Sequence, residues 1–437
     1  MVEKLKGVWG RNRRVLSNFF SLSVLQYTTY LVPLITLPYL VRVLGPARYG
    51  LVEFARAFSV YFVVFTEYGF SLSATQQISV HRDDPHKVSE IFSAVLVVRL
   101  LLLLVSLLFL GLLILGVPKV RAEWPVFVFA FGTVLGQCLF PVWLFQGLER
   151  MKQIAVLHVA ARILITVSIF VFIRRSSDYL YVPLVQSSGI VLMGVSGLIL
   201  ALRVLPVRFA FPTPAALRHQ IVSGWHLFIS RVAVTLCTTS NVVILGLLAE
   251  DVFVAYYAAG EKIVRAVTDA LHIPLSQAVF PHVGKLAARS KAAALNFTRR
   301  VARVGSVVAL ALSAGLYLGA GHLTRLVLGP GFEASVIVVR ILSLLPFIVG
   351  FNHILGIQIM ANFGFQKTLA RILAAAGVLN IVVVLALVLP LKHVGVAIAS
   401  LTTETLIVVA MFVALRKKGL NVFAPSDESS DNHQVVT

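Results

Sequence analysis

The chain has 437 residues, of which 58% are hydrophobic and 13% are charged, and its formal net charge is +20 at pH 7. A soluble protein of this length cannot bury so much apolar surface, and its long runs of Leu, Val, Ile and Ala lack the alternating pattern of a membrane barrel. The basic excess does not indicate nucleic-acid binding, because no soluble basic domain is present to carry it. We therefore predict an all-α integral membrane protein.

Apolar segments of about 20 residues, each long enough to cross a hydrocarbon core of about 30 Å, recur along the whole chain. We predict about twelve transmembrane helices from them. In chain order they lie at 17–41, 51–77, 91–115, 124–146, 153–173, 180–202, 221–248, 252–280, 303–328, 334–361, 368–390 and 394–415. The loops between these segments are too short for a folded extramembrane domain.

The loop charges indicate how the chain is oriented. When the N-terminus is placed in the cytoplasm, most of the 38 Lys and Arg residues fall on the cytoplasmic side, as the positive-inside rule requires. We therefore predict that both termini are cytoplasmic. The basic start resembles a signal peptide, but the apolar run is too long and no small-residue cleavage site follows it, so we expect an uncleaved first helix.

The two halves of the chain resemble each other. A shift of 204 residues places Arg99 on Arg303 and overlays the short turns 43–50 and 247–254. Because each half has about six predicted helices, an even number, both insert with the same orientation as a parallel pseudo-repeat, with substrate sites expected between the two lobes. We predict an N-terminal segment (1–16), an N-lobe (17–202), a cytoplasmic linker (203–220), a C-lobe (221–416) and a disordered cytoplasmic tail (417–437).

Basic residues lie inside several apolar segments, where each costs about 2.5–3.5 kcal/mol on insertion scales. They are Arg56, Arg99, Arg162, Arg231, Lys262, Arg265 and Arg340. Fewer acids share these segments, namely Glu53, Glu67, Glu261, Asp269 and Glu404. The surplus favours a cavity of positive potential, and Arg suits phosphate because its planar fork binds two oxygens at once. Among these cations, Arg99 is the best candidate for snorkelling to an interface.

Two charge patterns admit both a structural and a functional interpretation. Glu261, Arg265 and Asp269 share one helical face beside Lys262, as an ion-pair ladder or as a gate or ion-coupled site. Glu53 and Arg56 are three residues apart and can pair at an interface or at a ligand. We predict substrate binding by Arg231, Lys262, Arg265, Arg340, Arg56 and Arg162, and ion coupling or gating by Glu261, Asp269 and Glu53.

Signatures of catalysis, metal binding and cofactor binding are missing from the sequence. It contains no phosphate-binding GxxxxGK[ST] loop, no HExxH motif and no paired cysteines. We expect Cys138 and Cys237 to be buried small hydrophobic residues. Asp83 and Asp84 lie near His81 and His86, but a solvated loop explains this cluster better than a metal site. The tenth segment carries Asn352, His353, Gln358 and Asn362, which suit interhelical hydrogen bonds or a sugar-bearing ligand.

Several stretches together resemble Wzx-type O-antigen flippases, the polysaccharide-transporter branch of the multidrug/oligosaccharidyl-lipid/polysaccharide exporter superfamily. The matching stretches are Pro38–Pro46 with Tyr49-Gly50, Glu67–Thr75, Trp143–Met151, Tyr256–Ile263 and Pro274–Gln277. They occur in the family's order over most of the chain. Arg150 stands where the family often has Lys, which keeps the charge.

This resemblance implies a two-lobed alternating-access flippase in the bacterial inner membrane. Its substrate would be an undecaprenyl-diphosphate-linked oligosaccharide unit, moved from the cytoplasmic to the periplasmic leaflet by an ion gradient for O-antigen synthesis. Its partners would be this lipid-linked oligosaccharide, membrane lipids, and the polymerase and chain-length regulator of the same pathway. The resemblance implies neither enzymatic activity nor a cofactor, and it transfers no binding motif.

Three alternatives stay open at this point. A multidrug or organic-cation antiporter of the same superfamily would need a net acidic cavity, which the surplus of intramembrane cations opposes. A membrane polysaccharide polymerase or ligase would need a sizeable periplasmic loop with catalytic groups, and the sequence contains none. A scramblase or scaffold would move lipids without coupling to a gradient.

Overall fold

The computed structural model describes residues 2–205 and 207–420, and for residues 2–34 and Cys237 it describes the backbone alone. The predicted tail beyond residue 420 therefore lies outside the described residues. In the described ranges every regular element is a helix, so the predicted all-α membrane fold is confirmed. The elements are α1(Val2–Glu67), α2(Phe70–Val80), α3(Pro85–Gly116), α4(Pro118–Ala122), α5(Trp124–Leu139), α6(Val142–Gly147), α7(Met151–Phe172), η1(Ser176–Leu180), α8(Tyr181–Val204), α9(Pro214–Thr238), α10(Ser240–Leu248), α11(Asp251–Arg289), α12(Lys291–Val327), α13(Ser335–Leu342), α14(Leu345–Asn352), η2(His353–Ala361) and α15(Gln366–Lys417).

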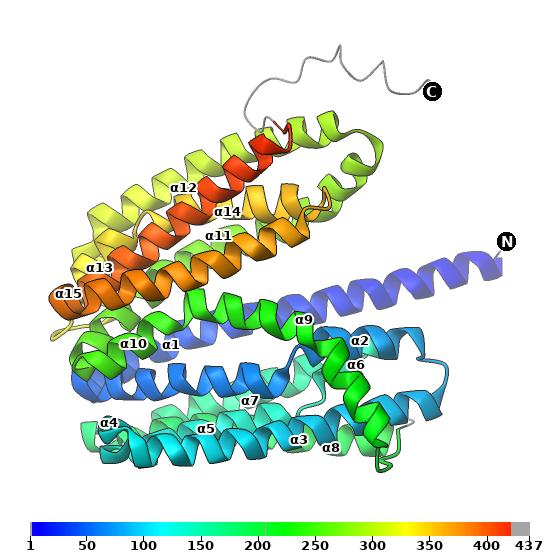
Figure 1. The fold of residues 1–437 in the computed structure, drawn as a ribbon, viewed down its shortest axis with the longest axis horizontal. Coiled ribbons are helices and arrows are strands. Elements are labelled where there is room, and N and C mark those ends of the chain that lie inside the picture. Colours follow the sequence, from blue (N-terminus) through cyan, green and yellow to red (C-terminus); the bar gives the residue numbers. More distant parts are fainter. Residues whose placement is uncertain (1, 206, 421–437) are drawn as a thin grey trace. The chain divides into compact units, whose positions relative to one another are not determined.

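Two of these elements are pairs of helices joined by a sharp reversal (Figure 1). In α1 the reversal lies at Gly45, with φ 70° and ψ 172°, a conformation that glycine adopts without steric cost. In α15 it lies at Lys392, with φ 48° and ψ −125°. Each reversal falls in a predicted loop, so the arms on its two sides correspond to successive predicted spans.

By length and apolar composition, the described residues contain 8 helices that can cross a membrane, or up to 9 if the bent pair Pro214–Leu236 and Ser240–Leu248 is one span. This number is lower than the predicted set for identifiable reasons. The two arms of α15 are taken together as one element here and contribute a single span. The first span begins at Ile35 and therefore does not include most of the first predicted segment, 17–41. The charged and polar residues of α11, including Glu261, Lys262, Arg265 and Asp269, keep it out of the count.

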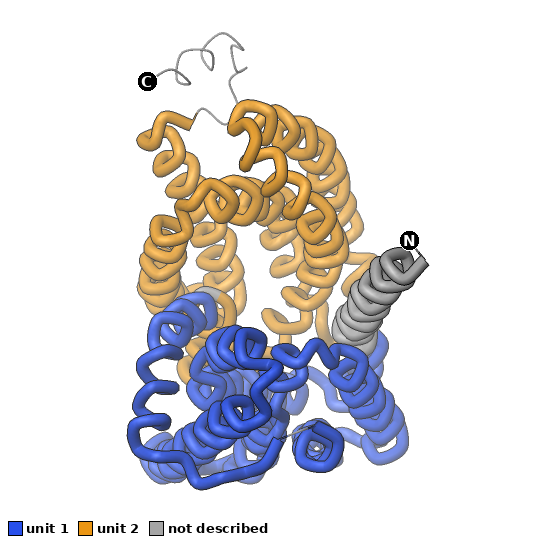
Figure 2. Tube along the Cα trace, turned by 90° about the vertical axis from the view of Figure 1, so that its right-hand side faces the viewer, with its two compact units in different colours: residues 1–235 blue, residues 236–437 orange. Residues whose placement is uncertain are grey.

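The chain forms two compact units, residues 1–235 and 236–437 (Figure 2). The division falls near the end of α9, so most of that helix belongs to unit 1. The lobe boundary predicted at 203–220 stays a prediction, because Pro206 lies outside the described residues.

Small residues allow the central helices of unit 1 to pack closely. A Cβ atom built on Gly194 of α8 would lie 2.2 Å from the carbonyl oxygen of Gly136 on α5. Gly132 lies one turn before Gly136 and faces Ser187 of α8 in the same way. This close approach of two backbones is typical of membrane helices, whose association depends on van der Waals packing because no hydrophobic effect drives it inside a bilayer.

Arg99 corrects one prediction. Its side chain does not snorkel to an interface but is buried, with 3% of the residue exposed. The guanidinium donates to the main-chain carbonyls of Gln137 at 2.8 Å and Phe140 at 3.3 Å, and it lies over the Trp143 ring at 4.6 Å. Pro141 separates α5 from α6 and supplies no N–H to the Gln137 carbonyl, so Arg99 satisfies that carbonyl and adds a second bond to Phe140, which also accepts the N–H of Val142.

Candidate functional site

Three of the predicted charged residues come together in unit 1. Glu53 and Arg56 of α1 form the expected pair, with 2.8 Å between Arg56 Nε and Glu53 Oε2. Glu53 is buried, whereas the Arg56 side chain is 50% exposed. Arg162 of α7 lies close enough to Arg56 for the two charges to interact. The cluster therefore combines two cations with one carboxylate, which leaves a net positive charge.

Arg231 gains an acidic partner that its sequence neighbourhood does not contain. Its Nε lies 3.9 Å from Glu67 Oε2 at the end of α1, and the Arg231 side chain is 59% exposed. This distance permits a weak ion pair rather than a tight hydrogen bond. Next to it, the Tyr68 ring stacks on Phe228 of α9, with ring centroids 4.6 Å apart and an interplanar angle of 12°.

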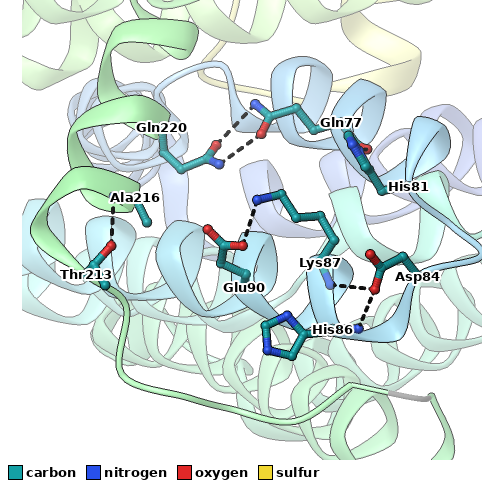
Figure 3. Close-up of polar contacts among 9 residues, drawn as sticks. All are labelled: Gln77, His81, Asp84, His86, Lys87, Glu90, Thr213, Ala216 and Gln220. Carbon is teal, nitrogen blue, oxygen red and sulfur yellow. Dashed lines mark hydrogen bonds and ion pairs between the residues drawn. The ribbon is translucent and has the colours of Figure 1, made fainter.

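The contact between the end of α1, α2 and α9 continues with a pair of glutamines (Figure 3). Gln220 Nε2 donates to Gln77 Oε1 at 2.9 Å, and Gln77 Nε2 donates to Gln220 Oε1 at 3.3 Å and to the Ser223 hydroxyl at 3.3 Å. Amide pairing of this kind fixes two helices in a defined register, so α9 is held on unit 1 by aromatic and polar contacts together.

The acidic loop before α3 caps a helix. One carboxylate oxygen of Asp84 accepts the backbone N–H groups of His86 and Lys87, and the Lys87 ammonium pairs with Glu90 at 2.7 Å (Figure 3). Hydrogen bonds from the backbone N–H groups of Lys87 and His86 hold the pKa of Asp84 below its usual value. Among the residues whose positions are described, no group of 3 or more His, Cys, Asp or Glu could hold a metal ion.

The predicted charge stripe of unit 2 is present on α11. Arg265 Nε donates to Glu261 Oε1 at 3.0 Å, and the charges of Glu404 on α15 and of Asp269 also act on Arg265. Glu404 in turn accepts a hydrogen bond from Asn352 of α14. Arg265 thus pairs with one carboxylate and feels the charge of two more, so this cluster is richer in acid than the predicted basic cavity. Lys262 lies beside it and is partly buried.

Arg340 is not part of this cluster. It lies on α13 with an exposed side chain. Within the described part of the chain, that side chain forms no hydrogen bond or ion pair with the α11 charges, although the Arg340 carbonyl accepts a bond from Ser343. The structure thus divides the predicted residues into a unit 1 set and an α11 set, and it leaves Arg340 apart from both.

A buried polar chain supports the α11 cluster. Asn380 of α15 donates to Asn241 of α10 at 2.8 Å and accepts from Thr403, in the second arm of α15, at 3.1 Å. Asn241 then donates to the Tyr257 hydroxyl of α11 at 3.1 Å. All four residues are buried, so these bonds fix how the helices of unit 2 pack. Asn380 and His272, which lies one turn beyond Asp269, were not among the residues predicted from the sequence.

Comparisons with known proteins point to polysaccharide biosynthesis and O-antigen transport. A family model described as polysaccharide biosynthesis protein matches residues 15–287. A protein of Escherichia coli (strain K12) named as an O-antigen transporter is 33% identical over 406 residues, which is 93% of this chain and 97% of that protein. A Shigella dysenteriae protein with the same name is 29% identical and covers 91% of this chain and 99% of its own length.

Solved structures share the fold at low sequence identity. The lipid II flippase MurJ in an inward closed conformation has a TM-score of 0.75 at 12% identity and covers 90% of this chain and 87% of its own. An inward-facing multidrug resistance transporter of the MATE family, MOP superfamily, has a TM-score of 0.72 at 14% identity. The match covers 92% of this chain and 98% of that transporter.

Proposed function

Because this chain belongs to the polysaccharide biosynthesis protein family, we propose that it is a flippase for lipid-linked oligosaccharide units. The substrate we propose is an undecaprenyl-diphosphate-linked repeat unit, moved from the cytoplasmic to the periplasmic leaflet of the bacterial inner membrane for surface polysaccharide assembly. The observation that carries the proposal is the 33% identity to an O-antigen transporter over 93% of the chain. The protein is a multi-pass membrane transporter and not an enzyme.

The charges of unit 1 support an anionic substrate. Among the described residues, Arg56 pairs with Glu53 and Arg231 with Glu67, Arg162 lies near Arg56, and the Arg56 and Arg231 side chains are half exposed. Exposed guanidinium groups within apolar helices can bind the two phosphates through bidentate, charge-assisted hydrogen bonds. We assign the diphosphate to these residues.

The charges of unit 2 support coupling to a cation gradient. Glu261, Asp269 and Glu404 act on or near Arg265, and carboxylates inside a membrane protein commonly mark cation or proton pathways. Binding of a cation at these carboxylates would weaken their electrostatic attraction to Arg265, and release of the cation would restore that attraction. We propose that this exchange accompanies alternating access. We also propose that both termini lie in the cytoplasm, and that the polymerase and the chain-length regulator of the pathway are partners.

The acidic cluster of unit 2 also favours a second candidate, an organic-cation antiporter. Such a protein would place its cargo at Glu261 and Glu404 and would not need the unit 1 cations. The two candidates therefore differ in which set of residues binds the cargo.

The test is a transport assay in liposomes that supplies both cargoes separately. Flipping of an undecaprenyl-diphosphate oligosaccharide is followed with a membrane-impermeant labelling enzyme, and efflux of ethidium is followed by fluorescence. Wild type should flip the lipid, and Arg162→Gln and Arg231→Gln should each lose about tenfold or more, because a hydrogen bond to a charged group contributes about 1.5–3 kcal/mol.

The matched control is Arg203→Gln, which removes the same charge from the exposed end of α8. It should flip lipid at the wild-type rate. Wild-type rates in folded Arg162→Gln and Arg231→Gln would remove both residues from the substrate site. Ethidium efflux without lipid flipping in the wild type would overturn the proposed function in favour of the antiporter.

A further inference from the structure

We propose that His272 and His353 form a proton-binding site in unit 2, and that it is the site through which a proton gradient drives transport. The inference deepens the proposed function and rests on it, because it identifies the coupling ion. It starts from a geometric continuation: the stripe of Glu261, Arg265 and Asp269 along α11 is followed one turn later by His272 and two turns later by Ser276.

The two imidazoles are neighbours with defined hydrogen bonds. Their ring centroids lie 5.5 Å apart. His272 Nε2 lies 2.6 Å from the carbonyl oxygen of Pro346, and since a carbonyl only accepts, Nε2 carries the hydrogen. The protonatable nitrogen of His272 is therefore Nδ1. On the other ring, His353 Nδ1 lies 2.7 Å from the Ser276 hydroxyl, which can donate to it or accept from it.

A small internal pocket connects these groups. It has a volume of about 20 Å³ and is lined by His272, Ser276, Ser306, His353 and Gln358 among apolar residues. Most of the residues that line it are apolar, but its volume is sufficient for about one water molecule, to which His272, Ser276 and His353 offer polar groups. Water or a hydroxyl between two imidazoles is the arrangement that lets a proton pass from one ring to the other.

Backbone features around the pocket place the rings there. Pro274 lies inside α11, where it removes one intrahelical hydrogen bond. His353 begins η2, a π-helical segment, and such turns inside helices often occur at functional sites. A Cβ atom on Gly350 would lie 2.9 Å from His272 Cε1, so this glycine makes room for the ring. Gln358 Nε2 donates to the carbonyl of Ser276 and ties η2 to α11.

The charges that face the pair favour one bound proton. On α11, the carboxylate of Asp269 acts on His272, and Arg265 and Glu261 act on Asp269. Each imidazole acts on the other, so the first proton opposes a second. The pocket residues from α12 and α14 include Ser306, Phe347 and Gly350 and carry no charge, while Glu404 of α15 acts on Arg265. The pair thus takes one proton from hydronium and returns it to water on the other side of the membrane.

The experiment uses the full chain in proteoliposomes with an imposed pH gradient. His272→Gln and His353→Gln should lose gradient-driven flipping by about tenfold or more, yet should keep exchange of labelled lipid at zero gradient. His282→Gln is the matched control, because His282 is an exposed α11 residue that packs on Phe297 outside the pocket. It should behave as wild type. Ser276→Ala keeps both imidazoles and should shift the pH of the half-maximal rate.

A direct measurement separates this inference from the proposed function. Nitrogen NMR of the purified protein, labelled at histidine, should show one protonation step shared by His272 and His353 that is absent from either Gln variant. Folded variants with wild-type gradient-driven rates, or rings that do not titrate between pH 4 and 9 (a range set by the usual histidine pKa of about 6.5), would overturn the proton site. A wild type that titrates but does not flip lipid would overturn the proposed function alone.

Discussion

The Arg99 guanidinium donates to the main-chain carbonyl of Gln137 at 2.8 Å, deep inside unit 1. A second bond to Phe140 and the Trp143 ring complete its surroundings, where α5 gives way to α6. Trp143, Leu144 and Phe145, from one of the stretches that resemble the flippases, are all buried in the core around this point. This apolar part of the motif therefore forms a packing junction of unit 1.

Replacing Arg99 should destabilise unit 1 without acting on the cargo directly. Arg99→Leu leaves the buried Gln137 carbonyl without a donor, at a cost of about 1–3 kcal/mol, whereas the Phe140 carbonyl keeps the N–H of Val142. We expect a lower midpoint of thermal unfolding in detergent, and about the same flipping rate per folded molecule. The control is Arg303→Leu, since Arg303 occupies the repeat-related position but is exposed. An equal loss of stability in both variants would contradict the assigned role of Arg99.

The buried polar chain of unit 2 leads to a second expectation. Thr403→Ala removes a donor to Asn380 in a fully buried site and should lower the free energy of unfolding by about 0.6–1.7 kcal/mol, from the average to the largest value measured for bonds between membrane helices. Thr405→Ala is the matched control, because in the described part of the chain that exposed hydroxyl bonds to the Leu401 carbonyl of its own helix and to no other residue. Chemical unfolding of both variants checks the difference.

The sequence predicts the fold and only half of the candidate site. The length of an apolar segment identifies a membrane span, because a helix must be long and apolar enough to cross the bilayer. The Glu261–Arg265 pair follows from the spacing of side chains along a helix. Spacing cannot reveal partners on distant helices. Glu67 beside Arg231, Glu404 near Arg265 and the carbonyls that receive Arg99 all come from other elements. For the same reason, a surplus of cations along the chain did not predict an acid-rich cluster in unit 2.

The glutamine pair on α2 and α9 should contribute a measurable coupling energy. In a double-mutant cycle of Gln77→Ala and Gln220→Ala, we expect the two changes to be non-additive by about 0.5–1.5 kcal/mol in unfolding free energy, because each removes the same reciprocal bonds. Gln76→Ala on the exposed side of α2 provides the control cycle with Gln220→Ala and should be additive. Additivity in both cycles would show that the pair does not hold α9 to α2.

The Asp84 cap makes the start of α3 sensitive to acid. Because its folded pKa is depressed, the cap contributes its stability above the unfolded pKa of about 3.9 and loses it as the pH falls through the lower folded value. Hydrogen exchange of the His86 and Lys87 amides, corrected for the intrinsic rate, should therefore accelerate below that unfolded value. Asp84→Asn keeps an acceptor oxygen but should abolish this pH dependence, whereas Asp83→Asn makes the same charge change in the same loop and should retain it. Persistence of the acid response in Asp84→Asn would show that another group controls the end of this helix.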